Sequence, residues 1–255
     1  MPEQTIIHEV EQGSSDWWAV KAGIPSASNF DKIITPKTLK FSSSAEGYAH
    51  RLLAEELLRA PVDDASSSFM ERGQVLERAA VDYYEFERGV ESEAVGFILR
   101  DDRRVGGSPD RLVGANGGLE IKCPSAAVHV GYLLDEQGIG YRAQVQGLLY
   151  LAEREWWDTL SYHPDLPPAL VRQTRNEAFI TALVEALDRF NAMKDEMKAK
   201  LQGLGLFAGE EIPGVFPIDG VRRCSMCKRE AARPASLLCD TCAAEHNIQL
   251  LADSQ

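Results

Sequence analysis

The sequence predicts an α/β (α+β) fold in which helices flank a central mixed β-sheet. Amphipathic helical periodicity comes first, over residues 45–59 and 69–88. Strand-like runs follow between residues 93 and 122, and helical patterns return from residue 125 onward. Helices that precede and follow a block of strands are typical of a sheet covered by helices.

The helical segments of the first third carry their own start and stop signals. Ser14 precedes a short helical run that ends before Gly23, and Pro25 opens the next one. A serine oxygen caps the first amides of a helix, and glycine readily adopts the left-handed conformation that ends one. The predicted helices cover residues 14–23, 27–34, 45–59 and 69–88, with a polar loop at 35–44.

The remaining elements alternate between short strands and helices. Strands are predicted at 93–99, in a hairpin within 108–122, and at 156–162 and 170–174, with helices at 125–137, 141–153 and 176–201. Residues 205–220 contain several glycines and prolines and are interpreted as a linker. The linker divides the chain into a domain of residues 1–204 and a small module of residues 221–255.

Length and composition suit one large domain with a small appendage. The chain has 255 residues, of which 44% are hydrophobic. No apolar run is as long as a membrane span, and the first ten residues lack the apolar core of a signal peptide. We therefore expect no membrane association and a cytoplasmic location.

The overall charge is unusual for a nucleic-acid-binding protein. Lys and Arg total 27 against 39 Asp and Glu, a net charge of −12. Domains that bind nucleic acid are usually basic, so the average argues against this class. A focused local potential can still attract phosphate, because binding depends on the charge near the site.

The clearest chemical pattern lies in the segment SPDRLVGANGGLEIK, which runs from Ser108 to Lys122. Asp110 precedes a short apolar run, and a second run carries Glu120 and Lys122 on one face of an extended segment. Two carboxylates and an ammonium suit a hard divalent cation that activates a water beside it. For an isolated D…ExK pattern, an ordinary solvated hairpin is the simpler interpretation.

The register of this hairpin decides whether its charged groups share a face. With a two-residue turn at Asn116 and Gly117, Asp110 would point away from Lys122, because side chains alternate along a strand. A shared site therefore requires an odd-length loop, such as residues 115–117, or a bulge near Gly114.

Five motifs in a fixed order give this pattern its context: GSSDWWAVKAGIPSAS, ERGQVLE, GGSPD, LEIKCP and YRAQVQGLLY. Over residues 11–204 this series closely resembles the phage recombination exonucleases of the PD-(D/E)XK nuclease superfamily, the lambda-exonuclease or YqaJ-type group. The resemblance implies a restriction-endonuclease-like core and a catalytic centre that uses Mg²⁺ or Mn²⁺.

The resemblance assigns roles to the charged residues. Asp110 and Glu120 correspond to the metal-binding carboxylates, and the carbonyl of Ile121 would complete the shell. Lys122 corresponds to the lysine beside the attacking water. Glu77 matches a glutamate that reaches the metal directly or through water.

A helical glutamine completes the implied catalytic set. Gln144, in the AQVQ run, matches the family's glutamine at the active centre. Gln146 lies about 200° away on a helix, so only one of the two can serve that face. Tyr141 lies one turn before Gln144 and can share its face.

Two N-terminal residues correspond to the family's site for the DNA 5′ phosphate. Ser28 matches a serine that helps to hold the phosphate, and Lys21 falls where the best-known relative has an arginine. Arginine clasps a phosphate with two parallel donors, whereas lysine offers a compact point charge. This difference leaves the preference for a 5′-phosphorylated end open.

The C-terminal module carries a metal-binding pattern of its own. Cys224-x-x-Cys227 and Cys239-x-x-Cys242 are separated by eleven residues. In a chain without an export signal this spacing indicates a structural tetrahedral Zn²⁺ site in a zinc-ribbon-like module. The basic residues around the first pair suit nucleic acid or an acidic partner.

The sequence and its resemblance together predict a phosphodiester hydrolase. The expected activity is processive 5′→3′ digestion of one strand from duplex DNA ends, which leaves 3′ tails for recombination. The alternatives are an endonuclease or single-strand nuclease on the same core, or a non-catalytic DNA-binding or adaptor protein. The resemblance also implies a homotrimeric ring, a single-strand annealing protein as partner and, for a phage or prophage protein, the bacterial host cytoplasm.

Overall fold

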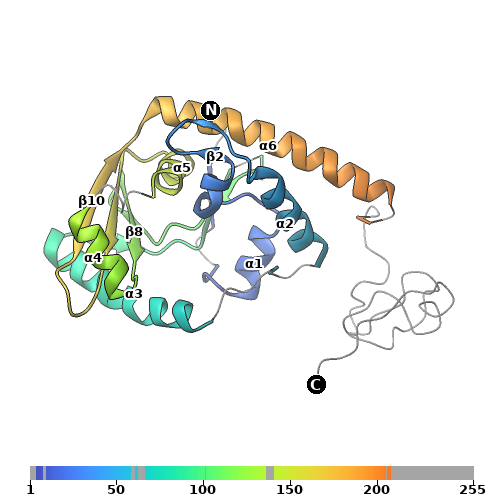
Figure 1. Ribbon diagram of the computed structural model, residues 1–255. Coiled ribbons are helices and arrows are strands. Elements are labelled where there is room, and N and C mark those ends of the chain that lie inside the picture. The colour runs from blue at the N-terminus through green and yellow to red at the C-terminus, as the bar shows by residue number, and fades with distance from the viewer. Residues whose placement is uncertain are drawn as a thin grey trace, which may run out of the picture. The chain divides into compact units, whose positions relative to one another are not determined.

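The computed structural model describes residues 4–7, 10–58, 61–62, 67–100, 102–135, 141–204 and 206–207 (Figure 1). The chain divides into two compact units, Met1–Glu196 and Met197–Gln255. The predicted linker, apart from residues 206 and 207, and the whole predicted zinc module lie outside the described residues. Their boundaries stay predictions.

Five strands form a central mixed sheet in the order β10-β9-β8-β7-β4. β8 and β9 run parallel, and the other neighbouring pairs are antiparallel. The strands are β4 (Ser92–Glu93), β7 (Arg111–Val113), β8 (Gly117–Lys122), β9 (Trp156–Ser161) and β10 (Ala169–Thr174). The predicted mixed sheet flanked by helices is therefore confirmed.

Two glycines allow β8 to lie tightly against its parallel neighbour. A Cβ atom on Gly117 would lie 2.1 Å from the Trp156 ring, and one on Gly118 would lie 2.3 Å from the Trp157 ring. The Asn116-Gly117-Gly118 run is typical of a turn, but only Asn116 lies in the loop. The two glycines begin the strand, where the absent side chains leave room for two indole rings.

The helices follow the predicted order. They are α1 (Ser15–Lys21), the 3₁₀ helix η1 (Ala27–Lys32), α2 (Ala45–Leu58), α3 (Ser67–Arg88), α4 (Ala126–Leu134), α5 (Arg142–Ala152) and α6 (Glu177–Gly203). Side chains of α3 are described from Leu76 on. The predicted loop at 35–44 instead contains a small hairpin, β2 (Ile34–Thr35) with β3 (Lys40–Phe41). None of the described helices is long and apolar enough to cross a membrane.

A second sheet has the order β1-β5-β6 and consists of β1 (Gln4–Ile7), β5 (Phe97–Arg100) and β6 (Gly106–Gly107). The single strand predicted at 93–99 is thus two strands in two sheets. All four β5 residues are buried, which requires cover on both faces. A Cβ on Gly106 would lie 2.3 Å from the Phe97 ring, so β6 depends on glycine for its close approach.

Helix α5 is the buried element that brings the N-terminal segments to the sheet. Eight of its eleven residues are buried. A Cβ on Gly147 would lie 2.4 Å from the Phe30 ring of η1, which shows how closely the two helices pack. The helix that carries Gln144 and the segment that carries Ser28 are therefore held together.

Candidate active site

The hairpin between β7 and β8 has an odd-length loop. Arg111 pairs with Leu119 and Val113 with Gly117, which leaves residues 114–116 as the connection. Gly114 has a φ of +53°, a left-handed conformation that glycine adopts without a steric penalty. The predicted odd-length loop is confirmed, although it spans 114–116 rather than 115–117.

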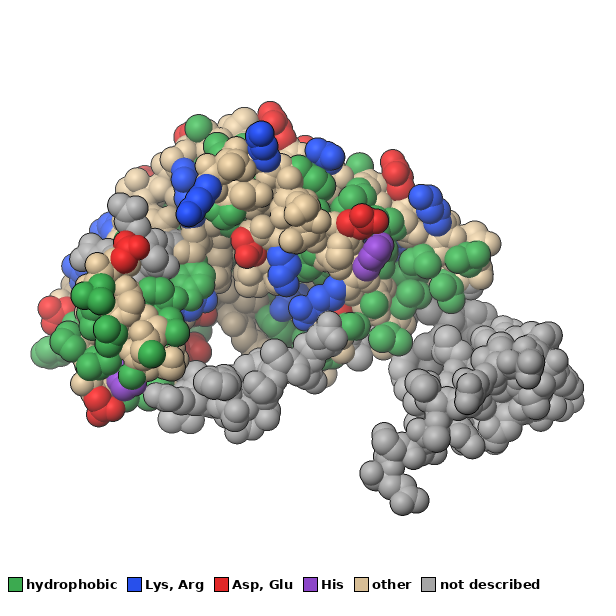
Figure 2. Space-filling view, viewed as in Figure 1, with side chains coloured by type: hydrophobic (Ala, Val, Ile, Leu, Met, Phe, Trp, Pro, Cys, Tyr) green, Lys and Arg blue, Asp and Glu red, His purple; other side chains and the backbone are tan. Residues whose placement is uncertain are grey.

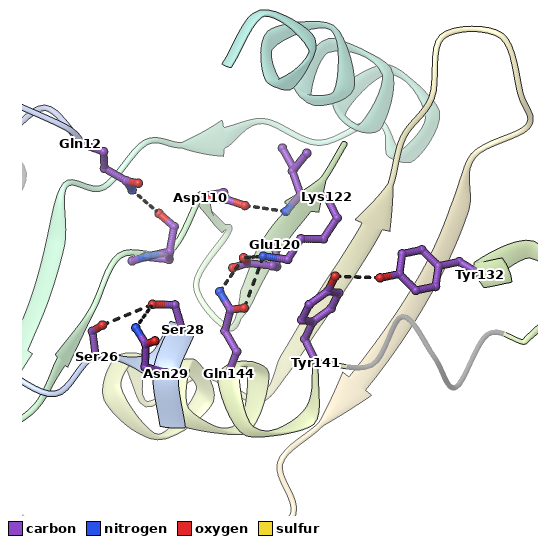
Figure 3. Close-up of polar contacts among 12 residues, drawn as sticks. Gln12, Ser26, Ser28, Asn29, Asp110, Glu120, Lys122, Tyr132, Tyr141 and Gln144 are labelled. Atoms are coloured by element: carbon purple, nitrogen blue, oxygen red, sulfur yellow. Dashed lines mark hydrogen bonds and ion pairs between the residues drawn. The ribbon is translucent and has the colours of Figure 1, made fainter. Parts of the chain in front are cut away.

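This register places the two candidate metal ligands on one face. Continuing the pairing by one residue sets Asp110 opposite Glu120, and directly opposed residues share a face of the sheet. Asp110 Oδ2 accepts a hydrogen bond of 2.6 Å from the backbone N–H of Ile121 (Figure 3). The aspartate is therefore fixed against the strand that carries the glutamate.

Glu120, Lys122 and Gln144 form a closed triangle of hydrogen bonds (Figure 3). Lys122 Nζ and Gln144 Nε2 each donate to Glu120 Oε1 over 2.6 Å. Lys122 Nζ also lies 3.4 Å from the side-chain oxygen of Gln144. The glutamine thus orients both members of the E-x-K pair.

One carboxylate oxygen of the site has no hydrogen-bond partner among the described residues. Glu120 Oε2 is buried and accepts no hydrogen bond. Burial raises the pKa of Asp110 well above its usual value, and the nearby Glu120 carboxylate raises it further. Burial also raises the pKa of Glu77, and Glu120 is among the groups that influence it. Converging carboxylates with an unsatisfied oxygen suit a hard cation with oxygen ligands.

The donor set fits a cation that keeps several waters. Among the described residues, no group of three or more His, Cys, Asp or Glu side chains is arranged to hold a metal ion. Asp110, Glu120 and the Ile121 carbonyl supply only part of a coordination shell. Mg²⁺ usually binds through one or two carboxylates and retains water ligands, so the two observations agree.

Lys122 is held in its charged form. Burial alone would lower its pKa, but Glu120 and Asp110 favour the ammonium, and the net pKa is raised. The ring of Tyr141 lies 4.7 Å from Nζ, and the Tyr141 hydroxyl lies 2.8 Å from that of Tyr132. This environment suits a stabiliser of negative charge better than a proton acceptor.

The two glutamines of α5 serve opposite sides of the helix, as their spacing predicts. Gln144 faces the carboxylates, whereas Gln146 is buried. The Gln146 side chain donates to the carbonyl of Thr174 over 2.9 Å and accepts from the N–H of Asn176 over 2.8 Å. It fixes the chain before α6 and has no contact with the site.

Two side chains before and within α1 hold the loop that carries Asp110. Gln12 Nε2 donates to the carbonyls of Pro109 and Val95 over 2.9 and 3.0 Å. Trp17 Nε1 donates to Ser108 Oγ over 2.8 Å. Sequence reasoning missed both contacts, because a long-range bond to a loop leaves no periodic pattern.

The proposed phosphate residues lie at the joint between α1 and η1. Lys21 Nζ is 4.2 Å from the centre of the Trp17 ring. Ser28 Oγ lies 3.3 Å from Ser26 Oγ and accepts from Asn29 Nδ2 over 3.2 Å. No direct contact joins Lys21 to Ser28 in the described structure, but Figure 3 shows Ser28 on η1 near the Gln144 helix. The four predicted zinc cysteines lie outside the described residues.

A mixed sheet whose hairpin presents Asp110, Glu120 and Lys122 on one face, with a glutamine from a packed helix, defines a PD-(D/E)XK core. The YqaJ-like viral recombinase domain matches residues 16–155. The chain belongs to this family.

Solved structures agree with this assignment. LHK-Exo in complex with dAMP is 27% identical, with a TM-score of 0.66 over 76% of this chain and 100% of that one. The alkaline exonuclease LHK-Exo from Laribacter hongkongensis is 26% identical, with a TM-score of 0.62 over 75% and 100%. A phage-related exonuclease from Haemophilus somnus 129PT shares the fold at 15% identity, with a TM-score of 0.56 over 70% and 96%. Among curated protein sequences none matches the chain.

Proposed function

We propose that the protein is a divalent-metal-dependent exodeoxyribonuclease that digests one strand of duplex DNA from its 5′ end. The observation that carries the proposal is the pair formed by the half-buried Asp110 and the buried Glu120 beside a charged Lys122. The family supports a nuclease that acts on DNA, and LHK-Exo is itself described as an alkaline exonuclease. The proposal also specifies that digestion is processive, that it runs 5′→3′ and that the metal is Mg²⁺.

Asp110, Glu120 and the Ile121 carbonyl would hold the metal, with Glu77 reaching it directly or through a water. With Mg²⁺ held by these residues, the site would gain a Lewis acid for acidifying a water and polarising the scissile phosphate. Burial keeps bulk water from the Glu120 carboxylate, which is 2% exposed. The protein thereby provides a fixed, low-dielectric set of oxygens.

Lys122 and Gln144 act on the developing charge and on geometry. The ammonium of Lys122 stabilises negative charge on the phosphate oxygens as the bond to the attacking oxygen forms. Gln144 orients the Glu120 carboxylate and the ammonium through the contacts described above. Holding these groups before the substrate arrives removes a reorganisation cost from the reaction.

Lys21 and Ser28 would bind the terminal 5′ phosphate, which selects the strand and its polarity. Trp17 links this region to the Asp110 loop, because it contacts both Lys21 and Ser108. A homotrimeric ring around the duplex and an interaction with a single-strand annealing protein belong to the same proposal. Their support is the resemblance of the ordered motifs to the lambda-exonuclease or YqaJ-type group.

The C-terminal module is proposed to bind one structural Zn²⁺ through Cys224, Cys227, Cys239 and Cys242. Its support is the regular spacing of two Cys-x-x-Cys pairs. A segment this short gains folding energy from the metal that it cannot gain from its own core. Elemental analysis of protein purified under reducing conditions should find one zinc per chain, and zinc-free, folded protein would contradict the assignment.

Linear duplexes labelled at either the 5′ or the 3′ end test the proposed activity. With Mg²⁺, the protein should release 5′ mononucleotides from linear duplex and leave covalently closed circles intact, and EDTA should stop the reaction. Release of the 3′ label before the 5′ label would contradict the proposed 5′→3′ polarity. Cutting of closed circles would show an endonuclease.

A further inference from the structure

One face of α2 lies against the joint between α1 and η1. Arg51 and Glu55 follow Tyr48 by three and seven residues, a spacing that places all three on one side of a helix. The Tyr48 hydroxyl accepts from the N–H of Ser26 over 3.1 Å. A Cβ on Gly23 would lie 3.1 Å from a Glu56 oxygen, so α2 also approaches the end of α1 closely.

Only one of the nitrogen atoms of the Arg51 guanidinium is bonded to Glu55, its neighbour one turn along α2. Arg51 Nε donates to Glu55 Oε1 over 2.9 Å. The side chain of Glu55 is 5% exposed, whereas that of Arg51 is 34% exposed. Within the described part of the chain, the two terminal amino groups of Arg51 have no hydrogen-bond partner, so they are free to receive a ligand.

Lys21 lies in the same electrostatic environment. Burial lowers its pKa, the Glu55 carboxylate raises it and the Arg51 charge lowers it. Two cations therefore influence one another across a single buried carboxylate. A second negative group, with access from solvent, would balance the charges of Lys21, Arg51 and Glu55.

Basic side chains are concentrated in this part of the molecule. Figure 2 shows Lys and Arg side chains gathered near the centre of one face, over α1. Acidic side chains are spread around them on the same face. A local positive centre of this kind can bind a phosphate although the chain carries a net charge of −12.

We propose that Arg51 is a specificity-determining residue for the terminal phosphate and that it supplies the two-pronged donor that Lys21 cannot provide. Lys21 contributes a point charge, Arg51 contributes parallel N–H donors and Ser28 contributes a hydroxyl. This inference rests on the proposed function, because it names a further residue for the 5′-phosphate site. Glu55 holds Arg51 by Nε and leaves the other edge of the guanidinium for the ligand.

The simplest competing account is that Arg51 and Glu55 form an ordinary i, i+4 pair that stabilises α2. The two explanations predict different phosphate preferences for a Glu55 variant. If the pair only stabilises the helix, Glu55→Gln and Arg51→Gln should have the same effect. If Arg51 binds phosphate, Glu55→Gln removes a repelling carboxylate and should preserve or increase the preference for a phosphate.

The experiment compares blunt duplexes that carry a 5′ phosphate or a 5′ hydroxyl. Full-length Arg51→Gln, Arg51→Lys, Glu55→Gln and the charge control Arg88→Gln are measured beside the unaltered protein. Arg88 is an exposed residue in the last turn of α3. Initial digestion rates are measured with Mg²⁺, and equilibrium binding of each duplex is measured in EDTA by fluorescence anisotropy.

Arg51→Gln should reduce the phosphate-to-hydroxyl ratio by about tenfold, as expected for charge-assisted hydrogen bonds. The ratio for Arg51→Lys should lie between those of Arg51→Gln and the unaltered protein, because lysine keeps the positive charge but lacks the parallel N–H donors of the guanidinium. Arg88→Gln should leave the ratio unchanged. Melting curves check folding, and a folding defect in Arg51→Gln leaves Arg51→Lys as the decisive variant.

An unchanged ratio in Arg51→Gln, or an equal fall in Glu55→Gln, would overturn the role of Arg51. If the unaltered protein shows no phosphate preference in either assay, the inference also fails. If the protein cleaves neither duplex but its binding ratio depends on Arg51, the proposed nuclease activity fails and the phosphate site stands. The binding measurement thus separates the two claims.

Discussion

The stability of the sheet beneath the site should depend on one tyrosine hydroxyl of α3. The Tyr84 hydroxyl donates to Asp158 Oδ2 over 2.8 Å. Asp158 is fully buried on β9, and Arg172 donates to both of its oxygens over 2.7 and 2.8 Å. The contact joins the helix that carries Glu77 to the strand beside β8.

Tyr84→Phe removes one of the three donors to this buried carboxylate and leaves almost no cavity. A hydrogen bond to a charged group contributes about 1.5–3 kcal/mol to stability. Arg172 remains to compensate the charge, so the loss should stay within this range. For a domain of this size, 2 kcal/mol corresponds to a fall of about 4–8 °C in Tm.

Tyr83→Phe provides the matched control on the same helix. Tyr83 packs beside Tyr162, and its hydroxyl has no hydrogen-bond partner among the described residues. Thermal and urea unfolding, followed by tryptophan fluorescence, should show a change of less than about 0.5 kcal/mol for this control. Equal stability of the Tyr83 and Tyr84 variants would refute the reasoning.

Two further perturbations test the close packing and the orientation of the site. Gly118→Ala should lower the free energy of unfolding by about 1–3 kcal/mol, because the new methyl group meets the Trp157 ring at 2.3 Å. Gly131→Ala, with no atom near the added Cβ, should instead be neutral or stabilising by about 0.5–1 kcal/mol, and equal melting of the two would contradict the packing argument. Gln144→Leu should reduce kcat about ten- to a hundredfold with little change in DNA affinity in EDTA, because the amide orients Glu120. A large loss of affinity with unchanged kcat would place Gln144 in DNA binding instead.

The elements that sequence reasoning located well are those with long periodic patterns. The helices predicted at 45–59, 69–88 and 176–201 correspond to α2, α3 and α6, because each repeats apolar residues over several turns. β1 and β6 were not predicted, since four residues and two glycines carry no readable pattern. The glycines after Asn116 resemble a turn signal but lie in β8, because close packing against Trp156 and Trp157, and not turn formation, explains them.

The site likewise contains residues that the sequence predicts and a residue that only the structure reveals. Side-chain alternation predicted only that Asp110 and Glu120 share a face if the loop has an odd length or a bulge. The resemblance of the five ordered motifs to a nuclease family, and not the D…ExK pattern alone, led to the prediction of a shared site. Arg51 was beyond reach, because its importance comes from the approach of α2 to α1. A partial signal was present, since Glu55 falls on the buried face that Tyr48 and Leu52 define.

The most direct test of the account compares Asp110→Asn with the unaltered protein on a labelled duplex in Mg²⁺. Asparagine keeps an oxygen that can accept from Ile121 N–H, so the melting temperature should not fall. The loss of one metal-binding carboxylate should slow cleavage by at least about a thousandfold, and calorimetric titration should show weakened Mg²⁺ binding. Folded Asp110→Asn protein that digests the duplex at a near-normal rate would contradict the assignment of the active site.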